Sequence, residues 1–177
     1  MLLNEKINRY HFLSAHLNLV VKINSAILFF VIIIMIVTKL VVHHSATDKA
    51  TTTINSIERG HRERGFVQIG YHKVIEGSGV IRNGRPESIQ GAHARGANLG
   101  SLGVCVVGNF EIEVPNTAQI DSLVNVLTKW CIDNGIDHTK IYGHYNVPGG
   151  TTPTVCPGRN LRSLMVQIKN RVKNNLS

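Results

Sequence analysis

The sequence of 177 residues predicts a mixed α/β fold, a single domain over about residues 39–177 that follows an N-terminal apolar extension over residues 1–38. Three observations support this prediction. Short apolar runs of strand length alternate with helix-like patterns along the chain. Residues 102–107 form a continuous apolar run, which is typical of a central strand covered on both faces. Longer segments carry apolar residues at helical spacing, so we expect about three helices.

The extension contains a continuous apolar run from Ala26 to Val37. A membrane-spanning helix needs about 20 residues, so this run reaches that length only if polar neighbours are included. Basic residues precede the run, as in a secretory signal, but no small-residue cleavage site follows it. Two alternatives therefore stay open. The segment is a signal or membrane anchor close to the domain, or translation starts at Met35.

Five segments are expected to form strands, because they are short, apolar and bounded by turn residues. They lie at residues 40–44, 69–75, 80–82, 102–107 and 140–142. The second and third of them flank a turn and predict a hairpin. Residues 91–98 are rich in glycine and polar side chains and match neither the helical nor the strand period. We expect a surface loop there.

Three helices follow from apolar spacing and from the residues at their ends. The first is expected over residues 51–64, with Gly65 ending it. Asn116 is expected to cap the second helix, and Gly135 is expected to stop it. Asn160 is expected to cap the third, which runs toward the C-terminus.

The net charge of +8 predicts an anionic partner or surface. Nucleic acid, anionic lipid and bacterial cell-wall polymer all qualify on charge alone. No nucleic-acid-binding motif accompanies the charge, so no nucleic-acid partner is expected. The C-terminal helix is basic and lacks acidic residues, which leaves open whether this face is only solvated or contacts an anionic wall or membrane.

The three cysteines are too few for a disulfide scaffold. Cys105 lies in an apolar strand-like run and Cys131 in a helical pattern, so both are expected to be small core residues. Cys156 differs, because it follows a loop and precedes Pro157 and Gly158. An odd number of cysteines leaves at least one free thiol, and Cys156 is the candidate for a thiolate held by a metal.

His144 and Cys156 stand at the two ends of a loop rich in glycine, proline and threonine. Imidazole and thiolate are ligands that Zn²⁺ takes in tetrahedral sites. A third ligand is expected from His43 or His44, whose side chains point to opposite faces of their strand. Spacing alone leaves both open. Three protein ligands would leave one position for water, which is the pattern of a catalytic zinc site.

No His-Glu-x-x-His helix is present, which excludes a zinc protease of that class. No glutamate lies beside the candidate ligands either, so a hydrolysis would need other groups for proton transfer and hydrogen bonding. The hydroxyl of Tyr71 is one candidate. Thr154, two residues before Cys156, is another, and it could donate a hydrogen bond to a developing oxyanion.

Several short motifs occur in one order along the chain: residues 42–47, 70–72, 84–87, 91–98, 101–108, 143–144 and 156–157. On these motifs the sequence resembles the zinc-dependent N-acetylmuramoyl-L-alanine amidases of the phage-lysozyme and peptidoglycan-recognition-protein type. The resemblance covers nearly all of residues 40–165. It implies a central mixed β-sheet flanked by helices. It also implies hydrolysis of the amide that joins N-acetylmuramic acid to the L-alanine of the peptidoglycan stem peptide.

The resemblance also implies roles for individual residues and a Zn²⁺ cofactor. The implied metal ligands are His43, His144 and Cys156. The implied catalytic residues are Tyr71 and Thr154, and the implied substrate-binding residues are His93, Arg95 and Asn98. Two features depart from the family pattern. The interval between His144 and Cys156 is long, and the apolar extension has no counterpart in the phage lysozymes.

The expected protein is a monomeric lytic enzyme of the endolysin type whose partner is peptidoglycan. It would act on the cell wall from the periplasmic or extracellular side, or after release from the cytoplasm by a phage. Association with a membrane through the run from Ala26 to Val37 stays open. Two other functions are compatible with the resemblance. One is a non-catalytic peptidoglycan-binding module, which the intact ligand set disfavours, and the other is a phage regulator that binds RNA polymerase.

Overall fold

A five-stranded sheet forms the centre of the domain in the computed structural model, which describes residues 36–177. The strands are β1 (Lys39–His44), β2 (Lys73–Ile75), β3 (Ile81–Asn83), β4 (Ser101–Val106) and β5 (Ile141–Gly143). Their order across the sheet is β3-β2-β4-β1-β5. Strands β1, β2, β4 and β5 are parallel, and β3 pairs with β2 in the antiparallel direction. The sheet is therefore mixed, which confirms the predicted fold class.

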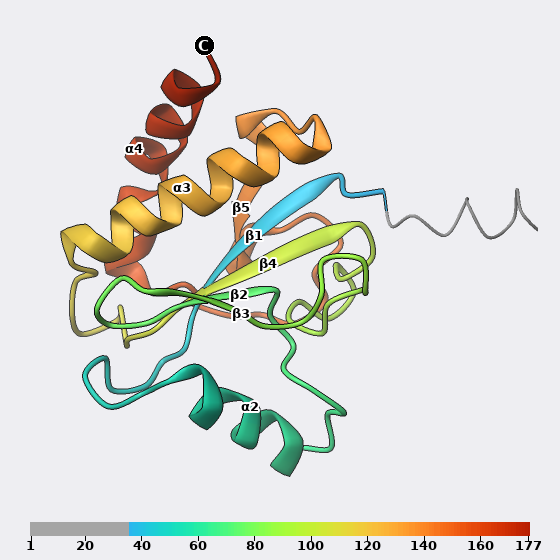
Figure 1. Ribbon diagram of the computed structural model, residues 1–177, viewed down its shortest axis with the longest axis vertical. Helices are drawn as coiled ribbons and strands as arrows, with labels where there is room; N and C mark the ends of the chain where they lie inside the picture. The colour runs from blue at the N-terminus through green and yellow to red at the C-terminus, as the bar shows by residue number, and fades with distance from the viewer. Residues whose placement is uncertain (1–35) are drawn as a thin grey trace, which may run out of the picture. The chain divides into compact units, whose positions relative to one another are not determined.

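Three helices cover the two faces of this sheet (Figure 1). They are α2 (Ile54–Glu63), α3 (Thr117–Asn134) and α4 (Arg159–Leu176). Helices α3 and α4 pack on each other and cover one face, and α2 lies on the opposite face. Two short 3₁₀ helices, η1 (His138–Lys140) and η2 (His144–Asn146), flank β5.

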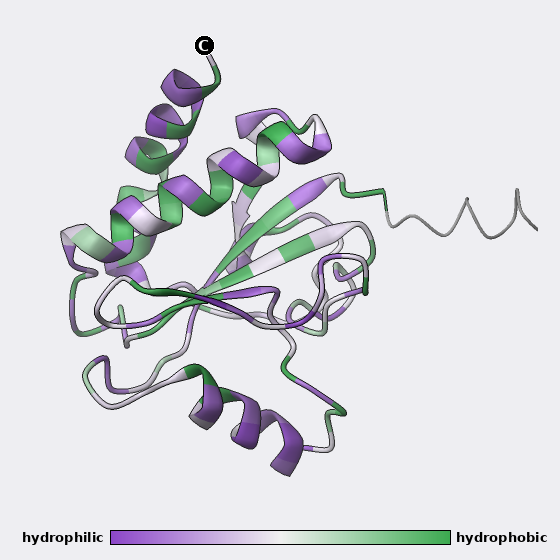
Figure 2. Ribbon diagram, in the orientation of Figure 1, coloured by the Kyte–Doolittle hydropathy of each residue, from purple (hydrophilic) through white to green (hydrophobic). Residues whose placement is uncertain are grey.

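The larger hydrophobic core lies between the sheet and the pair α3 and α4. Every residue of β4 is buried, as expected from its continuous apolar run. Figure 2 shows apolar residues along β1 and β4 and polar residues on the outer sides of α3 and α4. A smaller cluster on the other face includes Ile54 and Ile57 of α2 with Val74 and Cys105 of the sheet. The sheet thus has an apolar layer on both faces, and its strands form a rigid support for the loops at its ends.

The expected ends of α3 are confirmed. The Asn116 side chain accepts a hydrogen bond from the Gln119 amide at 2.9 Å, and the Gln119 side chain accepts one from the Asn116 amide at 3.3 Å. Gly135 at the other end has a φ of 62°, in the left-handed region that glycine adopts without a steric penalty.

The start of α4 differs from the prediction. The helix begins at Arg159, with Gly158 rather than Asn160 at the N-cap. The side chain of Asn160 instead donates a hydrogen bond to the carbonyl oxygen of Glu113 at 2.7 Å. The asparagine therefore ties the helix to a distant loop and leaves the cap position to glycine.

The second predicted strand is shorter than expected, because β2 begins only at Lys73. The preceding residues do form hydrogen bonds, but outside the sheet ladder. The Gly70 amide donates to Nδ1 of His61 at 2.8 Å, and the Gly70 carbonyl accepts from the Ala92 amide at 3.0 Å. This segment therefore connects α2 to the 91–98 loop beside the site.

The predictions made for residues 1–35, including the signal or anchor and the start at Met35, lie outside the described residues. Within residues 36–177, no helix has the length and apolar character needed to cross a bilayer. Val37 belongs to the core, and the Thr38 amide donates to the Gly100 carbonyl at 2.8 Å, just before β4. The domain boundary between residues 38 and 39 stays a prediction.

Candidate active site

Two of the candidate ligands come from the carboxyl ends of neighbouring parallel strands. His43 lies near the end of β1, and His144 directly follows β5. The pairing of Val42 with Gly143 brings the two histidines side by side, with ring centroids 4.5 Å apart. Crevices beyond the carboxyl ends of parallel strands are the usual ligand sites of such sheets, because the strands there stop and their loops diverge.

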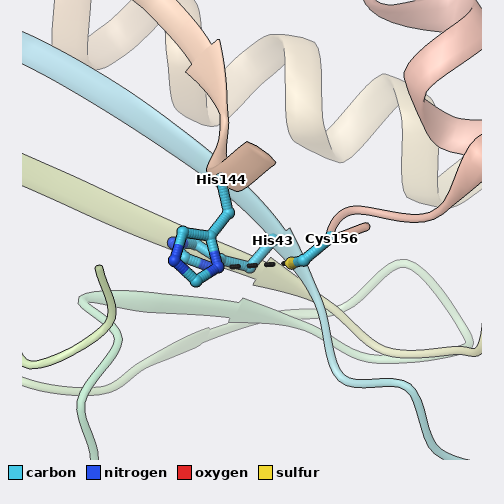
Figure 3. A group of neighbouring side chains, drawn as sticks. All are labelled: His43, His144 and Cys156. Atoms are coloured by element: carbon cyan, nitrogen blue, oxygen red, sulfur yellow. Dashed lines mark hydrogen bonds between the residues drawn. The ribbon is translucent and has the colours of Figure 1, made fainter. Parts of the chain in front are cut away.

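Cys156 reaches the same point through the long loop after β5. The Tyr145 amide donates to the Cys156 carbonyl at 2.9 Å, which closes the two ends of the loop on each other. The Sγ atom of Cys156 lies 3.6 Å from Nδ1 of His43. One ligand atom from each of His43, His144 and Cys156 lies within 4.8 Å of the others (Figure 3). The three residues predicted as metal ligands therefore form one cluster.

His44 points to the opposite face of β1, so the side chain of His43, and not that of His44, joins the cluster. Its Nδ1 accepts a hydrogen bond from the Phe110 amide at 3.1 Å. Its own amide lies 3.4 Å from Sγ of Cys156 and donates to it. His44 thus contributes to the cluster through its backbone, because its partially positive N–H group points at the sulfur.

Burial keeps the cluster uncharged in the absence of a cation. It lowers the pKa of His43 well below 6.5, and the neighbouring His93 and His144 lower it further. Burial also lowers the pKa of His144. It raises the pKa of the Cys156 thiol to about 12, although the hydrogen bond from the His44 backbone acts in the opposite direction. A thiolate at this position therefore needs a positive partner, which a divalent cation between the three side chains would supply.

Tyr71 lies beside the cluster, with its ring centroid 5.2 Å from that of His43. Burial raises the pKa of Tyr71 well above 10, and the neighbouring Cys105 and Cys156 raise it further. The hydroxyl is therefore protonated at neutral pH and can donate a hydrogen bond. Cys105 itself lies in the hydrophobic cluster under this site and Cys131 in the larger core, as expected for both.

Thr154 lines the cavity next to Cys156. Its Oγ1 accepts a hydrogen bond from the Cys156 amide at 3.1 Å. This contact uses a lone pair of the hydroxyl and leaves its proton available for a second partner. Thr154 thus stabilises the loop between His144 and Cys156, called the ligand loop below. Its hydroxyl can still donate one hydrogen bond.

The 91–98 loop forms one wall of the cavity and contains His93, Arg95 and Asn98. The prediction of a surface loop is wrong for half of it, because Ala94 and Ala97 are 0% and 1% exposed and pack on Val41. Asn98 Oδ1 accepts from the amides of His93 and Ala94 at 2.9 and 2.8 Å. The Arg95 carbonyl accepts from the Thr151 amide at 2.9 Å, which joins this loop to the ligand loop.

These groups surround an open cavity of about 660 Å³. Several of its lining residues were not predicted from the sequence, among them His61, Arg64 and Phe66. They stand at the end of α2, where His61 stacks on Phe66 at 5.1 Å and the Arg64 guanidinium lies 5.7 Å from the same ring centroid. In the sequence, Ile54, Ile57 and His61 form one stripe at helical spacing, and His61 is buried in the structure. Nothing in that pattern indicated that the stripe ends at a cavity.

The buried histidines predict that the metal-free protein loses stability in mild acid. Six described histidines have a lowered pKa: His43, His44, His61, His72, His93 and His144. Since the folded-state pKa lies below the unfolded value of about 6.5, their contribution is complete above pH 6.5 and is lost as the pH falls. For His93, whose pKa burial lowers to about 3, the loss is about 1.4 kcal/mol per pH unit below 6.5.

Thermal unfolding in the presence of chelator at pH 7.5, 6.5 and 5.5 measures this effect. We expect the melting temperature to fall between pH 6.5 and 5.5, and to fall less steeply in His93→Asn, which lacks one of the titrating groups. A melting temperature that is constant down to pH 5.5 would contradict the assignment of these histidines as neutral.

The comparisons with known proteins agree with this geometry. The family model described as N-acetylmuramoyl-L-alanine amidase matches residues 35–159. The endolysin of Enterobacteria phage T3 is 31% identical over 118 residues, which cover 62% of this chain and 72% of the endolysin. Peptidoglycan-recognition protein SD of Drosophila simulans is 36% identical over 106 residues, which cover 59% of this chain and 55% of that protein.

Among solved structures, the N-acetylmuramoyl-L-alanine amidase LysC from Clostridium intestinale URNW is similar with a TM-score of 0.71 and 30% sequence identity. The match covers 80% of this chain and 88% of that structure. Sequence family, relatives and fold therefore agree over the segment that carries the candidate ligands. This chain belongs to the N-acetylmuramoyl-L-alanine amidase family.

Proposed function

We propose that this chain is a zinc-dependent amidase that hydrolyses the bond between N-acetylmuramic acid and L-alanine in bacterial peptidoglycan. The single observation that carries the proposal is the donor cluster of His43, His144 and Cys156 on the cavity wall, in a chain that belongs to this family. The names of the relatives, an endolysin and an N-acetylmuramoyl-L-alanine amidase, support the same substrate.

The donor set fits Zn²⁺ in both chemistry and spacing. Two imidazoles and a thiolate are the nitrogen and sulfur ligands that this ion takes, and three protein ligands leave one position open. A metal–nitrogen distance of about 2.0 Å and a metal–sulfur distance of about 2.3 Å at a tetrahedral angle would separate the two donors by about 3.5 Å. The distance between His43 Nδ1 and Cys156 Sγ is 3.6 Å. The donor atoms of all three residues lie within 4.8 Å of one another, which is close enough for one ion to contact them together.

When bound, Zn²⁺ would supply Lewis-acid activation of water and of the scissile carbonyl. The protein's own groups then have two tasks. Tyr71, which keeps its proton, donates a hydrogen bond to the negative charge that develops on the carbonyl oxygen. Thr154 holds the Cys156 amide with its oxygen and donates its free proton to the same charge.

The 91–98 loop supplies the substrate-binding wall in this proposal. Arg95 is exposed on the cavity rim, where its guanidinium can pair with a carboxylate of the stem peptide. Asn98 uses its carbonyl oxygen within the loop, so its amide NH₂ group is the part that can donate to the glycan or peptide. His93 also lines the cavity and contributes through the edge of its ring.

We infer that the site of action is the bacterial cell wall, as for the endolysin relatives. The net charge of +8 supports association with this anionic polymer. A peptidoglycan-binding module without catalysis is the alternative that the peptidoglycan-recognition relatives suggest. The complete donor set favours the enzyme over this alternative, because binding alone needs no metal.

The experiment that tests the proposal is digestion of purified cell walls by the full chain. We expect amino groups to appear, and the new N-terminal residue to be L-alanine. Chelator should abolish their release, and added Zn²⁺ should restore it. Binding to the walls without release of amino groups would support the non-catalytic alternative and contradict the proposal.

A further inference from the structure

His93 lies directly behind His43, on the side away from Cys156. Nε2 of His43 is 3.0 Å from Nδ1 of His93. The other ring nitrogen of His43, Nδ1, faces the sulfur of Cys156 at 3.6 Å. His43 therefore has one nitrogen in the donor cluster and the other in contact with a second imidazole. Both rings are buried, with 1% and 9% of each residue exposed, which favours their neutral forms.

Ser101, at the start of β4, contacts the other ring nitrogen of His93. Its Oγ lies 3.0 Å from the Asn98 carbonyl oxygen and 3.5 Å from Nε2 of His93. A carbonyl oxygen can only accept, so the single hydroxyl proton of Ser101 is donated to Asn98. Toward His93 the Ser101 oxygen can then only accept. This leaves the ring proton of neutral His93 on Nε2 and makes its Nδ1 an acceptor.

The hydrogen bond between the two histidines determines which nitrogen of His43 carries the proton. Since Nδ1 of His93 accepts, Nε2 of His43 must donate. A neutral imidazole carries one proton, so Nδ1 of His43 is unprotonated. Its lone pair is directed at the donor cluster. A single chain of three hydrogen bonds, ending on a backbone carbonyl, thus determines which nitrogen of His43 is free to bind a metal.

We propose that His93 and Ser101 are positioning residues that fix the ring and the tautomer of His43, so that its Nδ1 is ready as a metal ligand before the ion binds. This inference rests on the proposed zinc site. Metal-binding histidines depend on such acceptors behind them, and loss of the acceptor weakens metal binding. The role uses both nitrogens of His93 and leaves the carbon edge of its ring for contact with the substrate.

Two glycines hold the His93 ring in place. A Cβ atom on Gly103 or on Gly91 would lie 2.5 Å from Cδ2 of His93, closer than real Cβ atoms approach. The ring therefore fits between two stretches of backbone that carry no side chain. Gly103 belongs to β4, and its amide donates to Nδ1 of His72 at 2.9 Å. Because β4 is a buried central strand, the slot that holds His93 is rigid.

The affinity of the full chain for Zn²⁺, measured by competition with a chromophoric chelator, tests this role. We expect His93→Ala to bind Zn²⁺ about 10- to 100-fold more weakly than wild type. His93→Asn should recover most of the affinity, because its side-chain oxygen can accept from His43 Nε2. Gly103→Ala should weaken binding in the same direction, since it displaces the His93 ring without touching a ligand.

A second readout separates positioning from folding. Nitrogen-15 imidazole spectra of the metal-free protein should show the His43 proton on Nε2 in wild type and a mixture of tautomers in Ser101→Ala. Ser122→Ala is the matched control, because its hydroxyl also donates to a backbone carbonyl, that of Gly79 at 2.6 Å, but on α3 away from the site. Melting temperatures of all variants check that they fold.

The outcomes distinguish this inference from the proposed function. A wild-type chain that binds no Zn²⁺ would contradict the proposed function itself. A wild-type chain that binds Zn²⁺, with equal affinity in folded His93→Ala, would overturn the positioning role alone. An unchanged His43 tautomer in Ser101→Ala would overturn the part of the inference that concerns Ser101.

Discussion

Cys156→Ser is expected to abolish both Zn²⁺ retention and amidase activity. The sulfur is one of three donors in the cluster, and its loss leaves two imidazoles and a harder, less acidic hydroxyl. Activity should fall to the level of chelator-treated wild type. The fold should survive, because the change replaces one atom and the Cys156 amide keeps its hydrogen bond to Thr154. Metal content after gel filtration and amine release from cell walls measure the two effects.

Cys131→Ala is the control for this prediction. Cys131 is also buried, at 2% exposure, but it lies on α3 in the larger core. Its removal should lower the melting temperature slightly and leave the zinc content unchanged. Full zinc retention in Cys156→Ser would show that the sulfur is not a ligand.

Tyr71→Phe is expected to lower turnover by about 10²- to 10⁴-fold while the zinc content stays the same. The substitution keeps the ring that packs 5.2 Å from His43 and removes only the hydroxyl, which burial keeps protonated. The loss should fall on kcat more than on KM, since the hydrogen bond is proposed to strengthen as charge develops on the carbonyl oxygen. Steady-state kinetics on a soluble muropeptide measure both constants.

Tyr142→Phe, on the edge strand β5, provides the comparison. Its ring packs on the cluster around Val41, and Lys169 lies 5.6 Å from its centroid. It does not line the cavity, so its turnover should match wild type. If Tyr71→Phe also turned over at the wild-type rate, the catalytic role of the Tyr71 hydroxyl would be excluded.

The donor cluster of the site could be predicted from the sequence, because its residue types are rare and their spacing is informative. Histidine and cysteine at the two ends of one loop indicated a metal, and two adjacent histidines on a strand indicated a third ligand. To choose between His43 and His44, one must know which face of β1 lies toward His144 and Cys156. Val41 and His43 share the face under the 91–98 loop, whereas His44 reaches Phe110 on the other.

The loops were harder to predict, because their hydrogen bonds go to distant partners. Residues 69–72 have the composition of a strand, yet the Gly70 amide bonds to the His61 side chain and leaves the ladder. The 91–98 loop has a polar composition, yet its alanines are buried against Val41. Local patterns describe a residue's period and polarity. They carry no information on which distant group will form a hydrogen bond with the backbone of that residue.

The path of the loop between His144 and Cys156 shows the same limit. Its length in the sequence gave no indication of how its ends meet. In the structure, the Thr151 amide donates to the Arg95 carbonyl and the Tyr145 amide to the Cys156 carbonyl, both at 2.9 Å. The loop therefore extends to the 91–98 loop and returns, and it joins two walls of the cavity.

Mass spectrometry of the products from one defined muropeptide identifies the bond that the chain cleaves. The full chain, loaded with one equivalent of Zn²⁺, is incubated with N-acetylmuramic acid linked to its stem peptide. We expect two products, the free sugar acid and an intact peptide with L-alanine at its N-terminus, and no products after chelation. Cleavage within the peptide or the glycan, or equal yields with and without the metal, would contradict the proposed function.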